Sequence, residues 1–182
     1  MKRLFLAFAA VGTLSLAGCS QPAEDTASAA PEAGSQTLAA MISDEGDFST
    51  VAGAMRDTGL AEVFDGTAAY TVLLPTDKAF EALGEDAELI TGEAQQAAMV
   101  AVLRDHIVPG TFTPADIATA IDSAAQGSVV MTSMGDHDIT FSRSGDTITV
   151  TSADGSTARL SGDAKQGANG VLIPLDAVLK KV

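Results

Sequence analysis

The sequence has 182 residues and a formal net charge of −14, from ten Lys and Arg against 24 Asp and Glu. This charge argues against a nucleic-acid-binding protein, because neutralising phosphates requires cationic side chains. The single cysteine excludes an intramolecular disulfide and a zinc site made of several thiolates. The absence of Trp, with one Tyr and seven Phe, leaves few rings to stack on sugars or bases.

The first 18 residues are typical of a secretory signal peptide. Lys2 and Arg3 form a cationic start, and a mostly apolar run follows. The run is too short for a membrane-spanning helix, which needs about 20 apolar residues. It ends in Leu16-Ala17-Gly18-Cys19, which resembles the lipobox of bacterial lipoproteins. The resemblance implies cleavage before Cys19 and a diacylglycerol on its thiol.

This lipobox resemblance places the protein outside the cytoplasm, anchored to the cell envelope by lipid on Cys19. The alternative is a signal peptide in which the cysteine has no such role. Ser20 stands where Asp would indicate inner-membrane retention in enterobacteria. We therefore expect the outer membrane, with the domain on the periplasmic side or at the cell surface.

Residues 19–36 are predicted to be the lipidated cysteine and a disordered linker. Residues 20–36 contain no branched or aromatic apolar side chain, so they cannot bury enough apolar surface to offset the entropy of ordering. Residues 37–182 show no second boundary and no internal repeat, and one domain of about 100–200 residues is the natural expectation for this length.

The first half of this domain has helical spacing of apolar residues. Helices are predicted over 38–42, between Phe48 and Gly59, over 77–83, over 94–104, and from Pro114 to 121. Ser49 or Thr50 is expected to cap the second, and Thr76 or Asp77 the third. A β-rich run over 70–74 lies between them and stops at Pro75.

The second half has strand patterns. Strands are predicted over 128–133, 137–142, 146–152, 157–161 and 171–175, with turn signals between them. Pro174 removes a backbone donor, so the last strand is expected to lie at an edge or to carry a bulge. Helices followed by clustered antiparallel strands indicate an α+β fold.

Three segments of this domain resemble the fasciclin domain, an extracellular module. They are Tyr70-Thr71-Val72-Leu73-Leu74-Pro75-Thr76-Asp77-Lys78-Ala79-Phe80, Leu103-Arg104-Asp105-His106-Ile107-Val108-Pro109-Gly110 and Asn169-Gly170-Val171-Leu172-Ile173-Pro174-Leu175-Asp176-Ala177-Val178-Leu179. They follow the family's order, and the resemblance covers Thr37 to Val182. It implies a fasciclin-like wedge of antiparallel strands with several helices packed on it. It also implies cell adhesion or extracellular binding, usually without catalysis.

The resemblance gives a set of motif positions that we expect to be mainly structural. They are Thr76, Asp77, Phe80, His106, Pro109, Gly110, Asn169, Gly170 and Asp176. The family counterpart of His106 tends to bond across the core, and a ligand-binding role is the alternative.

Two departures from the family pattern limit what can be transferred. The family often has Tyr before its His, a pair linked to integrin adhesion in animal members, and Asp105 stands there in this chain. The last segment often carries His where this chain has Ile173. An integrin-type mechanism is therefore not transferable.

No sequence pattern points to an enzyme, a cofactor or a metal. The nucleophile-elbow, Ser-x-x-Lys and His-Glu-x-x-His motifs are all absent. His137 between Asp136 and Asp138 forms a trio that can hold a weak cation, but such exposed side chains are more often only solvated. Asp44, Glu45 and Asp47 resemble half of a calcium loop without its alternating ligands.

Two functions remain after these exclusions. The first is a lipid-anchored, non-enzymatic fasciclin-domain protein that mediates cell-surface adhesion or binds a protein or matrix partner. The alternative is a binder of a small apolar ligand, lipid or carotenoid-like, in the envelope. Met41, Met55, Met99, Met131 and Met134 can line such a site, although filling gaps in the core is the more ordinary role.

Overall fold

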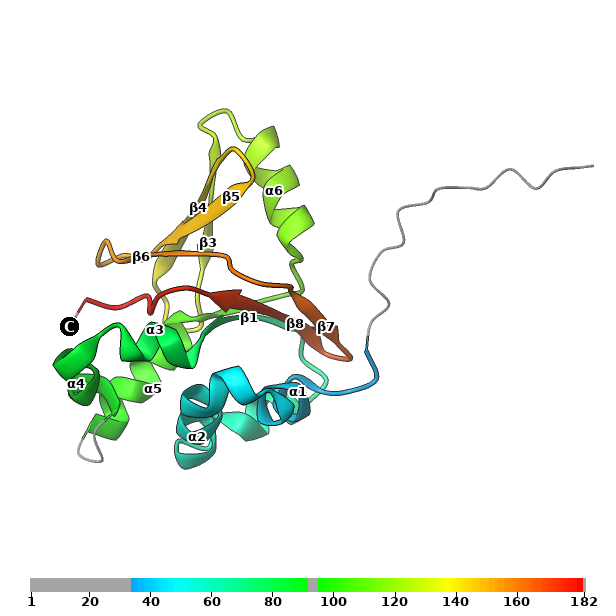
Figure 1. Cartoon of the computed structure of the whole chain (residues 1–182). Helices are drawn as coiled ribbons and strands as arrows, with labels where there is room; N and C mark the ends of the chain where they lie inside the picture. The colour runs from blue at the N-terminus through cyan, green and yellow to red at the C-terminus, as the bar shows by residue number, and fades with distance from the viewer. Residues whose placement is uncertain (1–33, 92–94, 182) are drawn as a thin grey trace, which may run out of the picture. The chain divides into compact units, whose positions relative to one another are not determined.

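The computed structural model describes residues 34–91 and 95–181, which form helices first and then mainly strands, as predicted (Figure 1). The α-helices are α1 (Leu38–Asp44), α2 (Ser49–Asp57), α3 (Asp77–Glu81), α4 (Glu88–Thr91), α5 (Gln96–Asp105) and α6 (Pro114–Ser123). Short 3₁₀ helices are η1 (Gly46–Phe48), η2 (Leu60–Asp65) and η3 (Gly84–Ala87). The predicted signal peptide, Cys19 and most of the predicted linker lie outside the described residues.

The strands of this part of the chain form two sheets of four. The strands are β1 (Tyr70–Pro75), β2 (Ile107–Pro109), β3 (Ser128–Thr132), β4 (Asp138–Ser144), β5 (Thr147–Thr151), β6 (Thr157–Arg159), β7 (Lys165–Gly167) and β8 (Gly170–Leu175). Sheet A has the order β2-β1-β8-β7, and sheet B the order β3-β4-β5-β6. Strands β2 and β7 were not predicted, because their sequences, Ile-Val-Pro and Lys-Gln-Gly, carry no alternating pattern.

The central pair of sheet A, β1 and β8, is parallel, with Tyr70 opposite Gly170 and Pro75 opposite Leu175. The other strand pairs are antiparallel. The prediction of antiparallel strands is therefore right for sheet B and wrong for this pair. A parallel pair requires a long connection, and here the whole of sheet B and α6 lie between the two strands along the chain.

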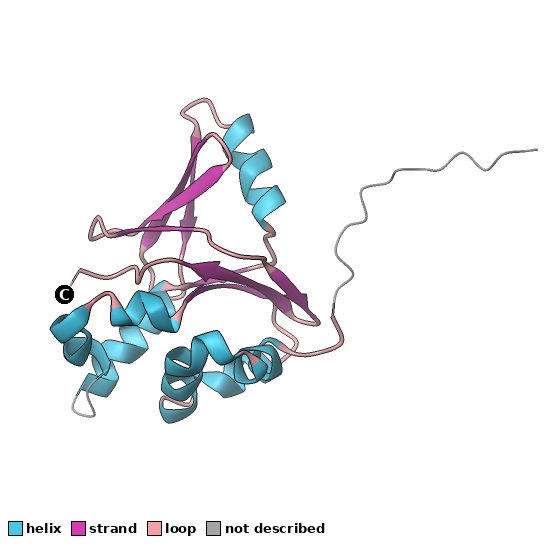
Figure 2. Ribbon diagram, in the orientation of Figure 1, coloured by secondary structure: helices cyan, strands magenta, loops and turns pink. Residues whose placement is uncertain are grey.

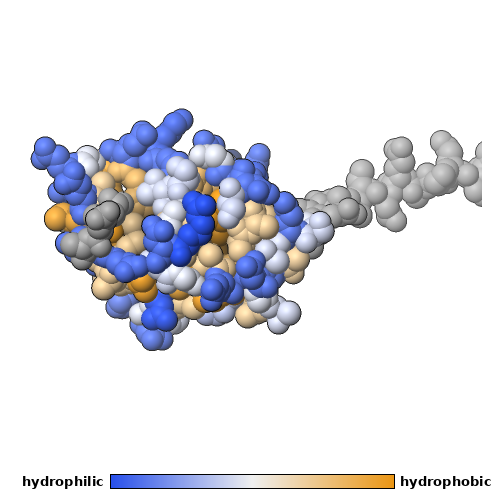
Figure 3. Space-filling view, turned by 90° about the horizontal axis from the view of Figure 1, so that it is seen from below, coloured by the Kyte–Doolittle hydropathy of each residue, from blue (hydrophilic) through white to orange (hydrophobic). Residues whose placement is uncertain are grey.

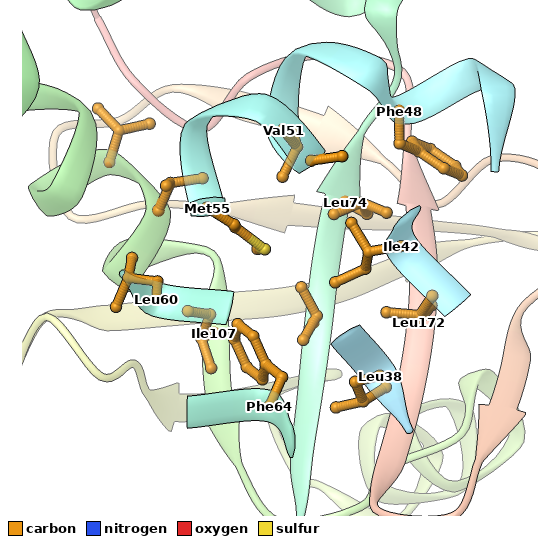
Figure 4. Close-up of a cluster of buried hydrophobic side chains, with 14 of the residues drawn as sticks. Leu38, Ile42, Phe48, Val51, Met55, Leu60, Phe64, Leu74, Ile107 and Leu172 are labelled. Atoms are coloured by element: carbon orange, nitrogen blue, oxygen red, sulfur yellow. The ribbon is translucent and has the colours of Figure 1, made fainter. Parts of the chain in front are cut away.

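Sheet A is buried on both faces. Successive side chains of a strand point to opposite faces. Val72, Leu74 and Leu172 pack with α1, α2 and α5 in the cluster shown in Figure 4. Leu73 and Ile173, which are paired in the ladder, belong to a second cluster on the other side. Nearly continuous apolar strands such as β1 and β8 are what a sheet covered on both faces requires.

The second cluster joins sheet A to sheet B and α6. Figure 2 shows α6 beside sheet B, apart from the other helices. Ile117 and Ile121 of α6 pack with Ile139, Phe141 and Val150 of sheet B. Alternation in β4 and β5 directs these side chains inward and their Ser and Thr neighbours outward. Thr113 starts α6 with a capping box to Asp116.

Strand β8, which contains Pro174, is not an edge strand of sheet A, so the edge alternative of the prediction is wrong. Strand β8 lies between β1 and β7, but the β7 ladder covers only positions 170–172 of β8. Beyond it, the Pro174 carbonyl accepts a hydrogen bond of 2.9 Å from Ser161 N. The proline is accommodated because it lies where regular pairing on that side has ended.

The predicted linker is ordered at its end. Gly34 N donates to Gln166 O, and Ala168 N donates to Gln36 O, each at 2.8 Å. Residues 34–36 thus pair with β7, and the prediction of disorder through residue 36 is wrong for these three residues. The polar composition that predicted disorder did not reveal the backbone bonds available at this sheet edge.

Gly170 brings β8 close to β1. Its φ is 152°, and a Cβ at this position would overlap Tyr70 O and lie 2.8 Å from Leu38 Cδ1. Only glycine permits this approach without a shift of the backbone.

We predict that Gly170→Ala lowers the free energy of unfolding by about 1–3 kcal/mol from backbone strain alone, with steric overlap added. Urea denaturation measures this change. Gly53→Ala is the matched control, since Gly53 lies within α2 and a Cβ there meets nothing within 4 Å. The control is expected to raise stability by about 0.5–1 kcal/mol. Equal effects of the two substitutions would contradict the proposed close approach.

Candidate functional site

The predicted motif residues lie at separate places in the domain and do not form one pocket. Thr76, Asp77 and Phe80 lie at the start of α3, Pro109 and Gly110 at the end of β2, and Asn169 and Gly170 at the start of β8. Phe80 is buried in the first cluster. Asp176 Oδ1 accepts from Arg159 N at 2.6 Å and so links β6 to the chain after β8. The contacts of Phe80 and Asp176 are within the domain, which is consistent with a structural role.

Asp77 caps a helix, but not its own. Thr76 caps α3 by accepting from Ala79 N. The Asp77 carboxylate accepts from Ser49 N at 3.1 Å and Thr50 N at 2.9 Å, at the start of α2. Partial burial raises the pKa of Asp77, but the hydrogen bonds from Thr50 and Ser49 outweigh it and lower the pKa overall. The expected self-capping of α2 by Ser49 or Thr50 is therefore wrong, because a residue 28 positions away supplies the acceptor.

Asn169 connects three segments. Its Nδ2 donates to Phe64 O at 2.6 Å and to Gly66 O at 2.9 Å, and its Oδ1 accepts from Leu38 N at 2.8 Å. The side chain is buried, and a buried amide needs such partners. Gly110 lies near the same end of β1, since both Pro109 and Gly170 pair with Tyr70, and its carbonyl accepts from Thr71 Oγ1 at 2.9 Å. The hydrogen bonds of Asn169 and Gly110 thus fix the segments next to the start of β1.

His106 is buried and fully hydrogen-bonded, with 2% of its surface exposed. Nε2 accepts from Leu179 N at 2.9 Å, so the hydrogen of a neutral ring is on Nδ1, which donates to Val102 O at 2.7 Å. Burial lowers the pKa of His106 and favours this neutral form. The ring connects α5 to the C-terminal segment, and both nitrogens are used, so the predicted structural role agrees with the geometry.

The neighbouring residue, Asp105, points toward the surface. His137 Nδ1 lies 2.8 Å from Asp105 Oδ1, and the side chains are 59% and 16% exposed respectively. The hydrogen bond and the charge of Asp105 raise the pKa of His137. Gly135 leaves room for the carboxylate, because a Cβ there would overlap Asp105 Oδ1. The hairpin between β3 and β4 is thereby tied to the end of α5.

A second charged pair lies beside this one. Lys180 Nζ is 3.9 Å from Asp154 Oδ2. Partial burial raises the pKa of Asp154, but hydrogen bonds from Ser152, Lys181 N and Ser156 outweigh it, so its pKa is strongly lowered and it stays ionised. Both pairs line a cavity of about 110 Å³ with Leu179. We call Asp105, His137, Asp154 and Lys180 the charged site.

The cation candidates of the sequence are engaged in other contacts. His137 bonds to Asp105, and Asp138 accepts from Thr132 Oγ1 at 3.0 Å. Glu45 pairs with Lys165, and Asp44 accepts from Gln36 Nε2 at 2.9 Å. Within residues 34–91 and 95–181, no group of three or more His, Cys, Asp or Glu side chains is placed to share a metal ion.

The methionines proposed for an apolar ligand site are largely core residues. Met41, Met55 and Met99 are buried in the first cluster, and Met131 and Met134 pack at the edges of the clusters. Cavities of about 300 and 410 Å³ include charged side chains in their walls: Arg159 and Asp176, or Asp77 and Glu81. Pockets for apolar ligands are lined mainly by apolar side chains. On the face shown in Figure 3, polar and charged residues separate small apolar areas.

The pairing of Asp105 with His137 was not predicted. The sequence marks Asp105 only as a departure from the family and His137 only by its neighbours. The two residues are 32 positions apart, and no local pattern connects them. Gly135 indicates a close approach of the Asp105 carboxylate only once the fold is known.

Comparisons with known proteins confirm the predicted fold. The sequence model of the fasciclin domain matches residues 46–181. A FAS1 domain pair from the insect cell adhesion molecule fasciclin I has a similar structure, with a TM-score of 0.68 and 12% sequence identity. The match covers 83% of this chain and 52% of that chain, so this chain spans about half of the two-domain structure. A comparison with curated proteins finds no match.

The two histidines are expected to change stability with pH in opposite directions. The lowered pKa of His106 means that the unfolded chain takes up its proton first, so stability falls as pH drops below the ordinary value of 6.5. The raised pKa of His137 gives stability that is complete below 6.5 and is lost as pH rises through the folded value.

Urea denaturation of the wild type, His106→Gln and His137→Asn at intervals between pH 5.5 and 8 separates these contributions. His106→Gln should flatten the fall in stability on the acid side, and His137→Asn should remove the loss on the basic side. Parallel pH profiles for all three proteins would contradict the assigned protonation states.

Proposed function

The chain belongs to the fasciclin family, and from this premise we propose that it is a lipid-anchored, non-enzymatic binding protein of the bacterial cell envelope. In this proposal Cys19 carries the lipid, and the domain mediates adhesion or binds a protein or matrix partner. Membership of the family implies adhesion or binding in general terms. The structurally similar domain pair comes from a cell adhesion molecule, which supports this role.

The observation that carries the proposal is the charged site. His106 is buried and both its nitrogens are bonded, so it is not available to a partner, whereas the side chain of His137 in the charged site is 59% exposed. The half-exposed charges around it suit polar contacts with a protein or matrix surface. Charged groups at such surfaces contribute mainly specificity and association rate.

The geometry of the charged site supports binding over catalysis. His137 and Asp105 resemble the orienting half of a serine-hydrolase triad, and Ser152 lines the same cavity. However, Ser152 Oγ donates to Asp154 Oδ1 at 2.5 Å. Its hydrogen is directed to a carboxylate and not to the imidazole that would activate it.

The charge of the chain supports attachment by lipid. Anionic membranes attract basic segments by about 1 kcal/mol per Lys or Arg, and this chain has an excess of 14 negative charges. Among the described residues, none of the helices has the length and hydrophobicity to cross a membrane. Acylation of Cys19 would hold the domain at the envelope against this repulsion.

We predict that Cys19→Ala moves the full-length protein from the membrane fraction to the soluble fraction and lowers attachment of the cells to a surface. Fractionation of lysed cells and a surface-attachment assay measure the two effects. Ser20→Ala is the matched control, since it leaves the cysteine in place. Undiminished membrane association of Cys19→Ala would contradict the lipid anchor.

The charged site is tested separately in the same cells. His137→Asn removes the imidazole of the charged site but leaves Cys19 unchanged, so the protein should remain in the membrane fraction while attachment falls. Equal attachment by cells with and without the protein would contradict adhesion, even if the anchor is confirmed.

A further inference from the structure

Strand β3 differs from the other outer strands of the two sheets. Natural proteins protect sheet edges with charged residues, proline or a covering segment, because an open edge can pair with another chain. Strand β7 carries Lys165 and is covered by residues 34–36, and β6 carries Arg159. Strand β2 ends in Pro109, and its Ile107 carbonyl accepts from Met134 N.

Strand β3 has no charged residue or proline. Helix α6 packs against it, and Met134, just after the strand, donates to Ile107 O of β2, but the backbone groups at its outer edge are not paired with any described residue. The sequence of the strand is Ser-Val-Val-Met-Thr, with no charged residue, proline or glycine, although the chain is strongly acidic. Val130 is 57% exposed, and only Leu89, among the described large apolar residues, is comparably open at 56%. An exposed apolar side chain on an uncharged edge strand is a pairing site that other chains can use.

The hydrogen-bond register shows which groups of β3 face outward. Ser133 N donates to His137 O, so in the alternating antiparallel ladder Met131 and Val129 bond to β4. The hydrogen bonds of β5 are consistent with this alternation. Leu160 N donates to Ile148 O on the side of β5 that faces away from β4. Ser128, Val130 and Thr132 therefore direct their N–H and C=O groups away from β4. In the described part of the chain, no backbone hydrogen bond reaches this outer edge.

We propose that β3 is a homophilic interface, in which two copies of the chain pair their β3 strands antiparallel about a twofold axis at Val130. The strand is self-complementary in this register. Val130 lies opposite Val130 of the second copy, and Ser128 lies opposite the second copy's Thr132. All the outward-facing groups are then paired, with about six backbone hydrogen bonds, and the two B sheets become one continuous sheet.

A second copy fits this edge better than a charged partner. The edge offers no charge for a charged peptide to recognise, whereas an identical strand brings matching backbone groups and a second Val130 side chain. Two acidic domains repel each other at long range, and this electrostatic repulsion is weakest where their uncharged edges meet. Salt should strengthen pairing because it screens the repulsion. If the chain is lipid-anchored as proposed above, confinement to a membrane raises the effective concentration of partners.

The chain provides a clean crosslinking test, because Cys19 is its only cysteine and is the predicted lipid site. We would place Val130→Cys in the full-length protein and oxidise intact cells. The Cα atoms of a hydrogen-bonded pair are about 5.5 Å apart, within the range for a disulfide. We expect a disulfide-linked species of twice the monomer mass, at least fivefold more abundant than with Thr147→Cys, and more abundant at higher salt.

Thr147→Cys is the matched control because Thr147 is exposed and lies on β5, inside sheet B. Adding Thr132→Lys to Val130→Cys should reduce the dimer to the control level by placing a charge on the edge. Circular dichroism of each purified variant confirms that it is folded. Equal crosslinking of both cysteines, or crosslinking of Val130→Cys to a different polypeptide, would overturn the proposal. Neither result affects the lipid anchor, which fractionation of Cys19→Ala tests.

Discussion

The parallel pairing of β1 with β8 is the constraint on which the rest of the domain depends. It joins segments about 100 positions apart, with Tyr70 opposite Gly170, so folding must close a long loop before the pair forms. The pair is buried on both faces and separates two apolar clusters. Burial alone does not define the register. Gly170 permits the close approach to Tyr70, and Asn169 satisfies the backbone of the segments that lead into it.

The charged site follows from the same arrangement. Leu73 N donates to His106 O at 2.8 Å, and the His106 ring accepts from Leu179 N, so β1, the end of α5 and the chain after β8 are held together. This brings Asp105 next to His137 from sheet B and Lys180 from the C-terminal segment. A buried histidine thus positions a set of partly exposed charges at the surface of the domain.

Features with a local cause were predictable from the sequence. Strand β1 ends at Pro75, Thr76 caps α3, and alternation in β4 identifies Ile139 and Phe141 as inward-facing. Contacts between distant segments were not predictable, because local periodicity does not encode them. Examples are the parallel direction of β1 and β8, the capping of α2 by Asp77, and the pairing of Asp105 with His137. The family resemblance supplied the architecture but not these contacts.

Hydrogen exchange of the native protein tests the central role of the β1–β8 pair most directly. Amides that open only on global unfolding exchange slowest. We predict that those of Val72, Leu73 and Leu172 are the slowest in the domain, with opening free energies equal to the global free energy of unfolding. The contradictory result would be faster exchange at these positions than at Val150 in sheet B, since sheet B would then hold together without the central pair.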